Sequence, residues 1–419
     1  MNIHAPPLGI NPLAKPVDFL LADIAIRVQL SRTNHNKSIE HYQAIQNWID
    51  RDGSLLKGLV QLLYPQGSMA IDATIASKLT TDEFDIDIVA QLALDPSLTP
   101  QQVLDLLYVS IRGEKGSRYY DKTIRQTRCV TVEYADMHLD ITPMIRRVNT
   151  PDRESFLFHH CPERPDEPSY ALIGNPFGFA ELFKQRTPAD MAFADVFEQR
   201  SKAYDLIILA EADVDEVPEQ VPLYRKSKAV VILQLLKRWR NVRYDRRDGR
   251  KPPSIMKSEL VAQAANQSNT LSEELLLQSR HMLTVFEAAH RAGQCVEIRN
   301  PACPEHDVLT DRWPGDLQTQ AVFIDDLRDL VAQVERLCGP CSLPKMQAIM
   351  SDLFGETPTG AAFKSFNQTN GAAIVGGKSH HQRGSGKFVA PSVVGATAAP
   401  AKVSATPKHT FFGGEADDR

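Results

Sequence analysis

The segment Phe84-Asp-Ile-Asp-Ile-Val89 alternates apolar and acidic residues with a period of two. In a β-strand, side chains at positions i and i+2 lie on the same face, so Asp85 and Asp87 project together while the apolar residues face a core. Residues 137–141 alternate in the same way and contain Asp140. If these two strands pair, three carboxylates converge on one edge of a sheet.

Such a carboxylate cluster predicts a metal site. Three neighbouring carboxylates repel one another unless a cation lies between them. Sites built from carboxylate oxygens suit Mg²⁺ or Mn²⁺, and a two-ion site serves in-line phosphoryl transfer. We therefore expect Asp85, Asp87 and Asp140 to hold two such ions. Gly67-Ser68 supplies a complementary part, because glycine lets the backbone approach a phosphate and serine offers hydrogen-bond donors.

The rest of the chain indicates an α+β protein. A further strand pattern covers residues 129–134, and the proline-rich, charged residues 146–170 suggest a long loop. Residues beyond about 360 are rich in Ala, Gly, Ser, Thr and Pro, and this composition predicts a disordered tail. Apolar residues recur at helical spacing in 18–30, 39–56, 101–110, 224–240, 271–292 and 317–337.

Composition excludes several classes of protein. The chain has 419 residues and a formal net charge of -5, so a uniformly basic nucleic-acid-binding surface is excluded, although a local basic groove is not. No apolar run reaches the roughly 18 residues of a membrane span, and no secretory signal is visible. The six cysteines are too few for a disulfide framework in a chain of this length. We expect a cytoplasmic protein without a membrane partner.

Four residues suggest a structural zinc site. Cys303-Pro-Glu-His306 and Cys338-Gly-Pro-Cys341 each have the spacing of half a zinc site, and together they would form a Cys₃His set. The alternative is that they are ordinary buried or loop residues.

The motifs also resemble a known family. Gln66-Gly-Ser-Met-Ala-Ile-Asp-Ala-Thr74, then Asp85-Ile-Asp87, then His138-Leu-Asp-Ile-Thr-Pro143 resemble the nucleotidyltransferase core shared by polymerase beta, oligoadenylate synthetase and cyclic GMP-AMP synthase. They are most similar to the bacterial branch of cyclic-oligonucleotide synthases in anti-phage signalling, often called CD-NTases. The resemblance spans about residues 40–340, and it implies that Gln66, Gly67 and Ser68 bind the nucleotide.

A second part of the resemblance concerns a lysine. Arg225-Lys-Ser-Lys228 precedes Leu235-Leu-Lys-Arg-Trp239, and the corresponding helix of the family carries a lysine that contacts the donor triphosphate. The spacing favours Lys228 over Lys226 and Lys237. The alternative is a helix with solvated basic ends.

The resemblance implies a two-lobed enzyme. Residues 1–16 would be an irregular lead-in, 17–150 the polymerase-beta-like catalytic core with a mixed sheet and N-terminal helices, 151–355 a mostly helical lobe closing the nucleotide cleft, and 356–419 the tail. It would use ATP and other NTPs to make a cyclic di- or trinucleotide, which activates a downstream effector. Two alternatives remain: a nucleotidyltransferase that modifies a protein, an antibiotic or an RNA end, and a catalytically silent nucleotide- or RNA-binding scaffold.

The tail ends in a second candidate feature. Thr410-Phe-Phe-Gly-Gly414 places two aromatic residues in a polar context, and exposed aromatics reduce solubility unless a partner covers them. We expect a protein partner that binds or processes this C-terminal peptide, with a remnant of no function as the alternative.

Overall fold

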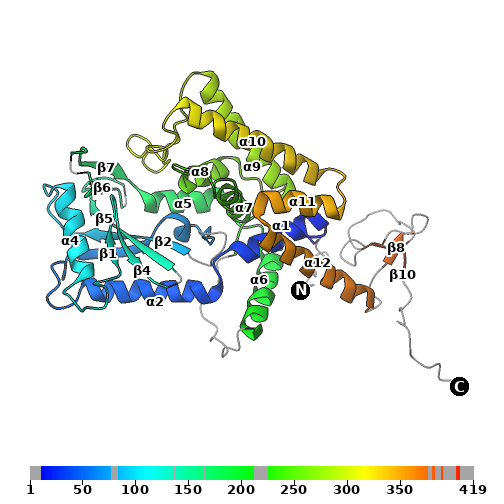
Figure 1. Ribbon diagram of the computed structural model, residues 1–419, viewed down its shortest axis with the longest axis horizontal. Helices are drawn as coiled ribbons and strands as arrows, with labels where there is room; N and C mark the ends of the chain where they lie inside the picture. Colours follow the sequence, from blue (N-terminus) through cyan, green and yellow to red (C-terminus); the bar gives the residue numbers. More distant parts are fainter. Residues whose placement is uncertain are drawn as a thin grey trace, which may run out of the picture.

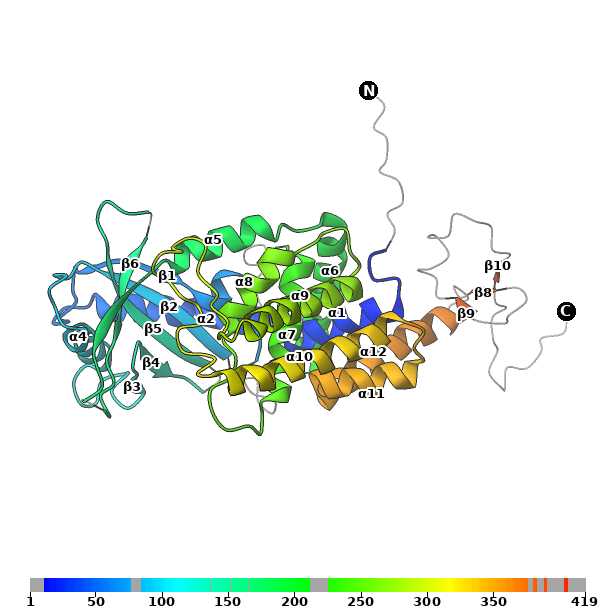
Figure 2. The same cartoon turned by 90° about the horizontal axis from the view of Figure 1, so that it is seen from above.

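The chain forms two lobes, a sheet with covering helices and a bundle of helices (Figures 1 and 2). The computed structural model describes residues 11–76, 84–135, 137–151, 153–164, 166–211 and 225–375, with the short stretches 380–382, 388–389 and 403–405. The predicted α+β architecture, with a mixed sheet beside a mostly helical lobe, is confirmed.

The sheet of the first lobe has a parallel pair of strands at its centre. Its order is β1-β2-β5-β4-β3, and β6 pairs with both β5 and β7. β2 and β5 run parallel, whereas every other pair in this sheet is antiparallel. The strands are β1 Val60–Pro65, β2 Phe84–Leu92, β3 Thr123–Arg125, β4 Val130–Glu133, β5 Met137–Arg146, β6 Ser155–His159 and β7 Tyr170–Gly174.

One face of this sheet is covered by α2 (Arg32–Ile49) and α4 (Pro100–Arg112). Ile45 and Ile49 of α2 and Leu107 of α4 share a core with Ile86, Ile88, Leu139 and Ile141 of the central strands. A capping box between Thr99 and Gln102 fixes the start of α4. Because strand side chains alternate, burial of the isoleucines on this face directs the intervening aspartates to the other face.

The prediction of a long loop over residues 146–170 is wrong. β6 begins at Ser155 and pairs antiparallel with the end of β5, and β7, which begins at Tyr170, pairs with β6. The prolines of this region lie between these strands, where they leave the ladder hydrogen bonds intact. The sheet therefore continues through β6 and β7 beyond the strands that the sequence suggested.

The helical lobe is organised around α7 (Lys228–Arg243), whose apolar side chains are almost all buried. Ser227 caps this helix by accepting a hydrogen bond from the Val230 N–H. The remaining helices are α1 Pro16–Val28, α5 Pro176–Arg186, α6 Met191–Glu211, α8 Ser254–Ala264, α9 Leu271–Arg291, α10 Leu317–Cys338, α11 Leu343–Phe354 and α12 Glu356–Val375, and a single-turn helix, α3 Gly67–Ala70, belongs to the first lobe.

The N-terminal helices connect the two lobes. Leu20, Leu21 and Ile24 of α1 belong to the core of the helical lobe, whereas Ile45 and Ile49 of α2 belong to the core beneath the sheet. The predicted second helix is displaced toward the N-terminus: it was expected over 39–56, but α2 begins at Arg32 behind the Ser31 cap and ends at Ile49.

The predicted disordered tail begins too early. Glu356–Val375 forms α12, in which Thr359 and Ala362 are fully buried and Phe366 meets the ring of Phe19 edge-on at 5.1 Å. This tertiary contact stabilises a segment whose composition alone is unfavourable for a core. Beyond it, β8 His380–Gln382, β9 Phe388–Val389 and β10 Val403–Ala405 form a small antiparallel sheet. The predicted peptide around residues 410–414 lies outside the described residues.

Candidate active site

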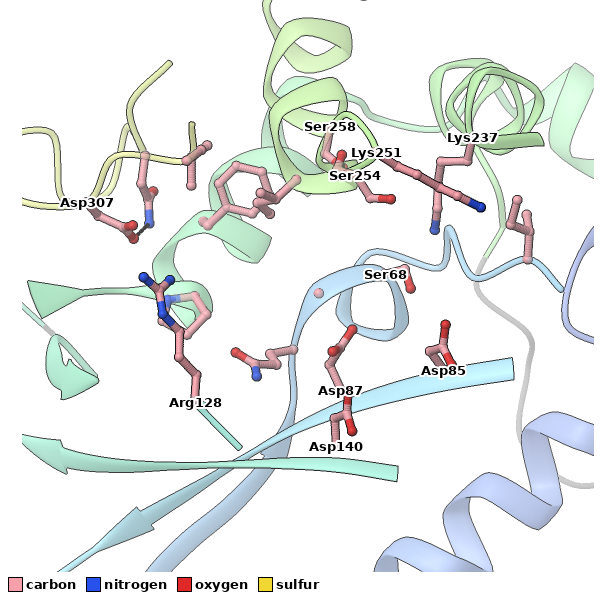
Figure 3. A pocket seen from close by; sticks show the side chains of 18 of the residues that line it. Ser68, Asp85, Asp87, Arg128, Asp140, Lys237, Lys251, Ser254, Ser258 and Asp307 are labelled. Atoms are coloured by element: carbon pink, nitrogen blue, oxygen red, sulfur yellow. Dashed lines mark hydrogen bonds between the residues drawn. The ribbon is translucent and has the colours of Figure 1, made fainter. Parts of the chain in front are cut away.

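The parallel pairing of β2 and β5 brings the three predicted aspartates together. In this register Asp87 lies opposite Asp140, and Asp85 lies opposite His138, whose Nδ1 is 3.9 Å from the Asp85 carboxylate. Figure 3 shows the three carboxylates on one side of a cavity. The convergence predicted from strand periodicity is confirmed by this register.

The environment of the cluster makes its negative charge costly. Burial, together with the neighbouring charges of Asp140 and Asp85, raises the pKa of Asp87 to about 7. Asp140 is held from the adjacent strand, because the Thr131 hydroxyl donates a hydrogen bond to its Oδ1. Asp85 is the most open of the three, with 57% of its side chain exposed. A cation beside these carboxylates would relieve the repulsion.

Gly67 lies against Asp87 so closely that no side chain fits between them. It has a φ of +56°, and a Cβ at this position would lie 2.5 Å from Asp87 Oδ2. The backbone is fixed here, because the Gln66 N–H donates to the Asp87 carbonyl at 2.9 Å and the Gln66 side chain donates to Thr142 Oγ1 at 2.9 Å. Glycine is therefore required both by conformation and by space.

Ser68 follows Gly67 in the single turn of α3 and faces the same cavity. The Thr74 hydroxyl donates to Ser68 Oγ across 3.4 Å, and the Ala73 N–H donates to the Ser68 carbonyl at 2.9 Å. These contacts close the loop from Ser68 to Thr74 under the helical lobe. The predicted motif from Gln66 to Thr74 thus forms one compact turn at the base of the cavity.

Basic and hydroxyl groups of the helical lobe face the carboxylates. Lys237 and Arg240 of α7, Lys251, and Ser254 and Ser258 of α8 line the same cavity (Figure 3). The Lys237 ammonium donates to the Ala73 carbonyl at 2.7 Å, so it lies directly above the turn that holds Ser68. Burial and the nearby Arg240 lower the pKa of Lys237 to about 7, while Asp87 and Asp85 oppose the shift.

Arg240 is fixed rather than mobile. Its guanidinium donates to the Pro252 carbonyl at 2.9 Å and to Ser254 Oγ at 3.0 Å, and burial lowers its pKa to about 10. The group remains a cation at neutral pH. Lys237 and Arg240 together form a positive wall opposite the negative one.

The cavity between the two walls has a volume of about 700 Å³. Besides the charged groups, apolar side chains line it: Ile75, Leu157, Pro176, Phe179, Ile255 and Leu309. A cleft between lobes that combines apolar walls with converging polar and charged groups is where proteins usually bind nucleotide-sized ligands. The arrangement can hold a polyphosphate between its cations and, with a divalent ion, its carboxylates.

Lys228 does not lie in this cavity, and the prediction for it is wrong. Its ammonium donates to the carbonyls of Gln267 and Asn269 at 2.8 and 2.9 Å and pairs with Asp190 at 2.8 Å. Lys237 comes nine residues later in α7, and nine residues at about 100° each place it on the opposite side of the helix. Lys228 anchors the α7 N-terminus, and Lys237 faces the cleft.

The proposed zinc site is also wrong. Cys303 donates to Glu154 across 3.7 Å near the sheet, while Cys338 donates to the Ser272 carbonyl across 3.5 Å at the last residue of α10. The 22-residue α10 is about 33 Å long and separates the two half-motifs. Within the described ranges, neither half-motif belongs to a group of three or more His, Cys, Asp or Glu side chains that could hold a metal ion.

Sequence reasoning missed several lining groups. Arg240, Lys251, Ser254 and Ser258 belong to the cavity but stand in no motif that indicates it. The sequence offered one signal for these groups, the basic run Lys237-Arg-Trp-Arg240 in a largely apolar helix. Buried cations require a partner, so this run indicates that negative groups or a ligand lie beside the helix.

The comparisons with known proteins agree with this geometry. Residues 18–166 match the model of the Second Messenger Oligonucleotide or Dinucleotide Synthetase domain. The chain is 37% identical to the cyclic dinucleotide synthase CdnG of Bradyrhizobium diazoefficiens over 407 residues, and the alignment covers 96% of each chain. It is 24% identical over 348 residues to a c-di-GMP synthase of Roseivirga ehrenbergii, covering 81% of this chain and 84% of that one.

A solved structure extends the likeness to three dimensions. The CD-NTase CdnG of Bradyrhizobium diazoefficiens in complex with GTP matches with a TM-score of 0.74 and 35% identity, over 84% of this chain and 99% of that one. The chain therefore belongs to the CD-NTase family. It is a nucleotidyltransferase that synthesises cyclic oligonucleotides, as the sequence motifs predicted. No helix in the described part of the chain is long and apolar enough to cross a membrane.

Proposed function

We propose that this enzyme joins two nucleoside triphosphates into a cyclic dinucleotide, with pyrophosphate released at each transfer, and that Asp85, Asp87 and Asp140 are its catalytic residues. The observation that carries the assignment is the register of β2 and β5, which sets Asp87 opposite Asp140 beneath the cationic wall of α7. The names of the similar proteins, a cyclic dinucleotide synthase and a c-di-GMP synthase, support a dinucleotide product and guanine nucleotides among the substrates.

The donor groups fit Mg²⁺ or Mn²⁺. They are oxygens only, and the burial and mutual repulsion that raise the pKa of Asp87 indicate a place for positive charge. Mg²⁺ is usually held by one or two carboxylates together with substrate phosphates, so a complete protein cage is not required. We assign one ion to Asp85 and Asp87 and a second ion to a site completed by Asp140. When bound, such ions stabilise the charge on the reacting phosphoryl group and activate the attacking hydroxyl.

The chain's own groups then bind and orient the triphosphate. Gly67 lets the backbone approach a phosphate, and Ser68 adds N–H and hydroxyl donors beside it. Lys237 and Arg240 neutralise the triphosphate from the opposite side, in a cleft where apolar walls exclude water and strengthen these interactions. We assign to Asp140 the proton of the attacking ribose hydroxyl, since Thr131 fixes this carboxylate in position.

The product would serve as a second messenger. In the family the cyclic product activates a downstream effector in anti-phage defence, and we propose the same role here, in the cytoplasm where nucleoside triphosphates are available. The partner of the C-terminal peptide stays a prediction.

A labelling experiment tests the proposed function. The purified enzyme is incubated with Mg²⁺ and α-³²P-labelled NTPs, treated with phosphatase and analysed by thin-layer chromatography. A cyclic product retains the label of both its phosphodiester bonds. A linear dinucleotide loses its terminal phosphates, keeps only the label of its internal phosphodiester and migrates differently. Transfer of label to a protein or RNA acceptor would favour an enzyme that modifies another molecule, and no transfer would favour a silent scaffold.

A further inference from the structure

Two Asn-Pro pairs that are far apart in the sequence meet at one end of the cavity. Asn175-Pro176 begins α5, where the Asn175 side chain accepts a hydrogen bond from the Gly178 N–H at 2.8 Å. Asn300-Pro301 lies in the connection between α9 and α10, and the Asn300 amide donates to the Asn175 carbonyl at 3.0 Å. Both asparagines are almost fully buried. They form one rigid junction between the lobes.

This junction holds a carboxylate that the phosphate chemistry does not use. Asp307 Oδ2 accepts hydrogen bonds from the Asn300 amide at 2.8 Å and from the Asn175 N–H at 3.3 Å. Gly174 makes room for it, since a Cβ at that position would lie 3.1 Å from the same oxygen. The other oxygen, Oδ1, accepts no hydrogen bond from the described residues, and Asp307 lines the cavity.

The position of Asp307 separates it from the triphosphate machinery. Figure 3 shows Asp307 and Arg128 at one end of the cavity and Lys237 and Asp85 at the other. Apolar side chains, among them Phe179 and Leu309, line the same cavity and suit the faces of a flat ring. A nucleotide with its phosphates at the lysine end would therefore direct its base toward Asp307.

The chemistry of a fixed carboxylate limits which base it can accept. An ionised carboxylate only accepts hydrogen bonds. Guanine offers two adjacent N–H donors, at N1 and at the exocyclic N2, whereas adenine and cytosine place a ring-nitrogen lone pair beside their single amino group. The uracil N–H is flanked by two carbonyl oxygens. Guanine is thus the base whose edge meets a carboxylate oxygen with donors and without a repelling lone pair.

We propose that Asp307 is the residue that selects guanine in this cavity, with Asn175 and Asn300 as the groups that position it. The proposal rests on the proposed function, because it takes the nucleotide orientation from the phosphate site. Arg128 lies at the same end, and its guanidinium, which also pairs with Asp311 at 2.6 Å, suits the guanine O6 carbonyl next to N1. Burial and the charge of Asp311 raise the pKa of Asp307 above its ordinary value, while the hydrogen bonds from Asn300 and Asn175 and the charge of Arg128 oppose that rise.

The test compares nucleotide affinities by isothermal titration with α,β-methylene analogues of GTP, ATP and ITP. ITP carries hypoxanthine, which is guanine without the N2 amino group. The wild-type enzyme should bind the GTP analogue about 5- to 150-fold more tightly than the ATP analogue, which is the range for two well-placed hydrogen bonds to a base. Its affinity for the ITP analogue should be intermediate. Asp307→Asn should lose most of the preference for GTP over ATP.

Glu305→Gln is the matched control, because Glu305 is an exposed acidic residue of the same connection and does not line the cavity. It should keep the wild-type preference. An unchanged GTP-to-ATP ratio in Asp307→Asn would overturn the proposal. If that variant does not fold, equal affinity of the wild type for the GTP and ITP analogues overturns it instead. If the wild type binds no triphosphate at all, the proposed function itself fails. If it binds the GTP and ATP analogues with equal affinity, only this inference is refuted.

Discussion

Replacement of Gly67 by alanine tests the close approach between the α3 turn and Asp87. The φ of +56° costs alanine about 1 kcal/mol relative to glycine. The new Cβ would also lie 2.5 Å from Asp87 Oδ2, so the carboxylate must leave its preferred rotamer, at a further cost of about 1 kcal/mol. We expect the free energy of unfolding to fall by about 2 kcal/mol.

The same displacement should affect catalysis more than stability. A shift of about 1 Å in a catalytic group reduces turnover by about 100-fold, so Gly67→Ala should lose roughly that factor in pyrophosphate release. Gly53→Ala is the control, because Gly53 has a φ of +79° but no atom within 4 Å of its added Cβ. It should lose about 1 kcal/mol by urea denaturation and keep full activity. The reasoning is refuted if Gly67→Ala retains wild-type turnover, or if the two variants lose the same stability and activity.

Two further predictions concern charge. Asp87→Asn should abolish turnover. In metal-free buffer at pH 8, urea denaturation should give this variant a free energy of unfolding about 1–3 kcal/mol higher than that of the wild type. Near pH 4 the two should be equally stable. The pKa of Asp87 is 3.8 in the unfolded chain and about 7 in the folded one, so the wild type loses stability as the pH rises between these values. The asparagine amide does not titrate and loses none. Equal stability of the two proteins at pH 8 would contradict this reasoning. Lys237→Met should weaken binding of a triphosphate analogue at least tenfold. Lys228→Met should leave that affinity unchanged and lower only the melting temperature, because the partners of Lys228 are Asp190 and two carbonyls away from the cavity. Weaker binding in Lys228→Met would show that the original prediction was right.

The carboxylate cluster could be predicted because strand geometry leaves little freedom. A period of two puts Asp85 and Asp87 on one face, and burial of the isoleucines decides which face. The choice between Lys228 and Lys237 could not be made in this way. Helix spacing gives the angle between two residues, but which side of α7 faces the cleft depends on how the helix packs against α8 and the Ala73 carbonyl.

Elements stabilised by contacts with other elements were missed for a related reason. β6 exists because it pairs with the end of β5, and α12 exists because Phe366 packs on Phe19 of α1, at the opposite end of the chain. The junction around Asp307 left only a weak signal in the sequence, the two Asn-Pro pairs. Their junction becomes visible only when the connection between α9 and α10 is placed against β7 and α5.

The central claim, that these carboxylates catalyse synthesis of a cyclic dinucleotide, is tested most directly by the mass of the product. Purified enzyme with Mg²⁺ and all four NTPs should yield, after phosphatase treatment, a species with the mass of two nucleotides joined by two phosphodiester bonds. Asp87→Asn should yield none. A linear product only, or the same cyclic species from the Asp87→Asn variant, would contradict the account.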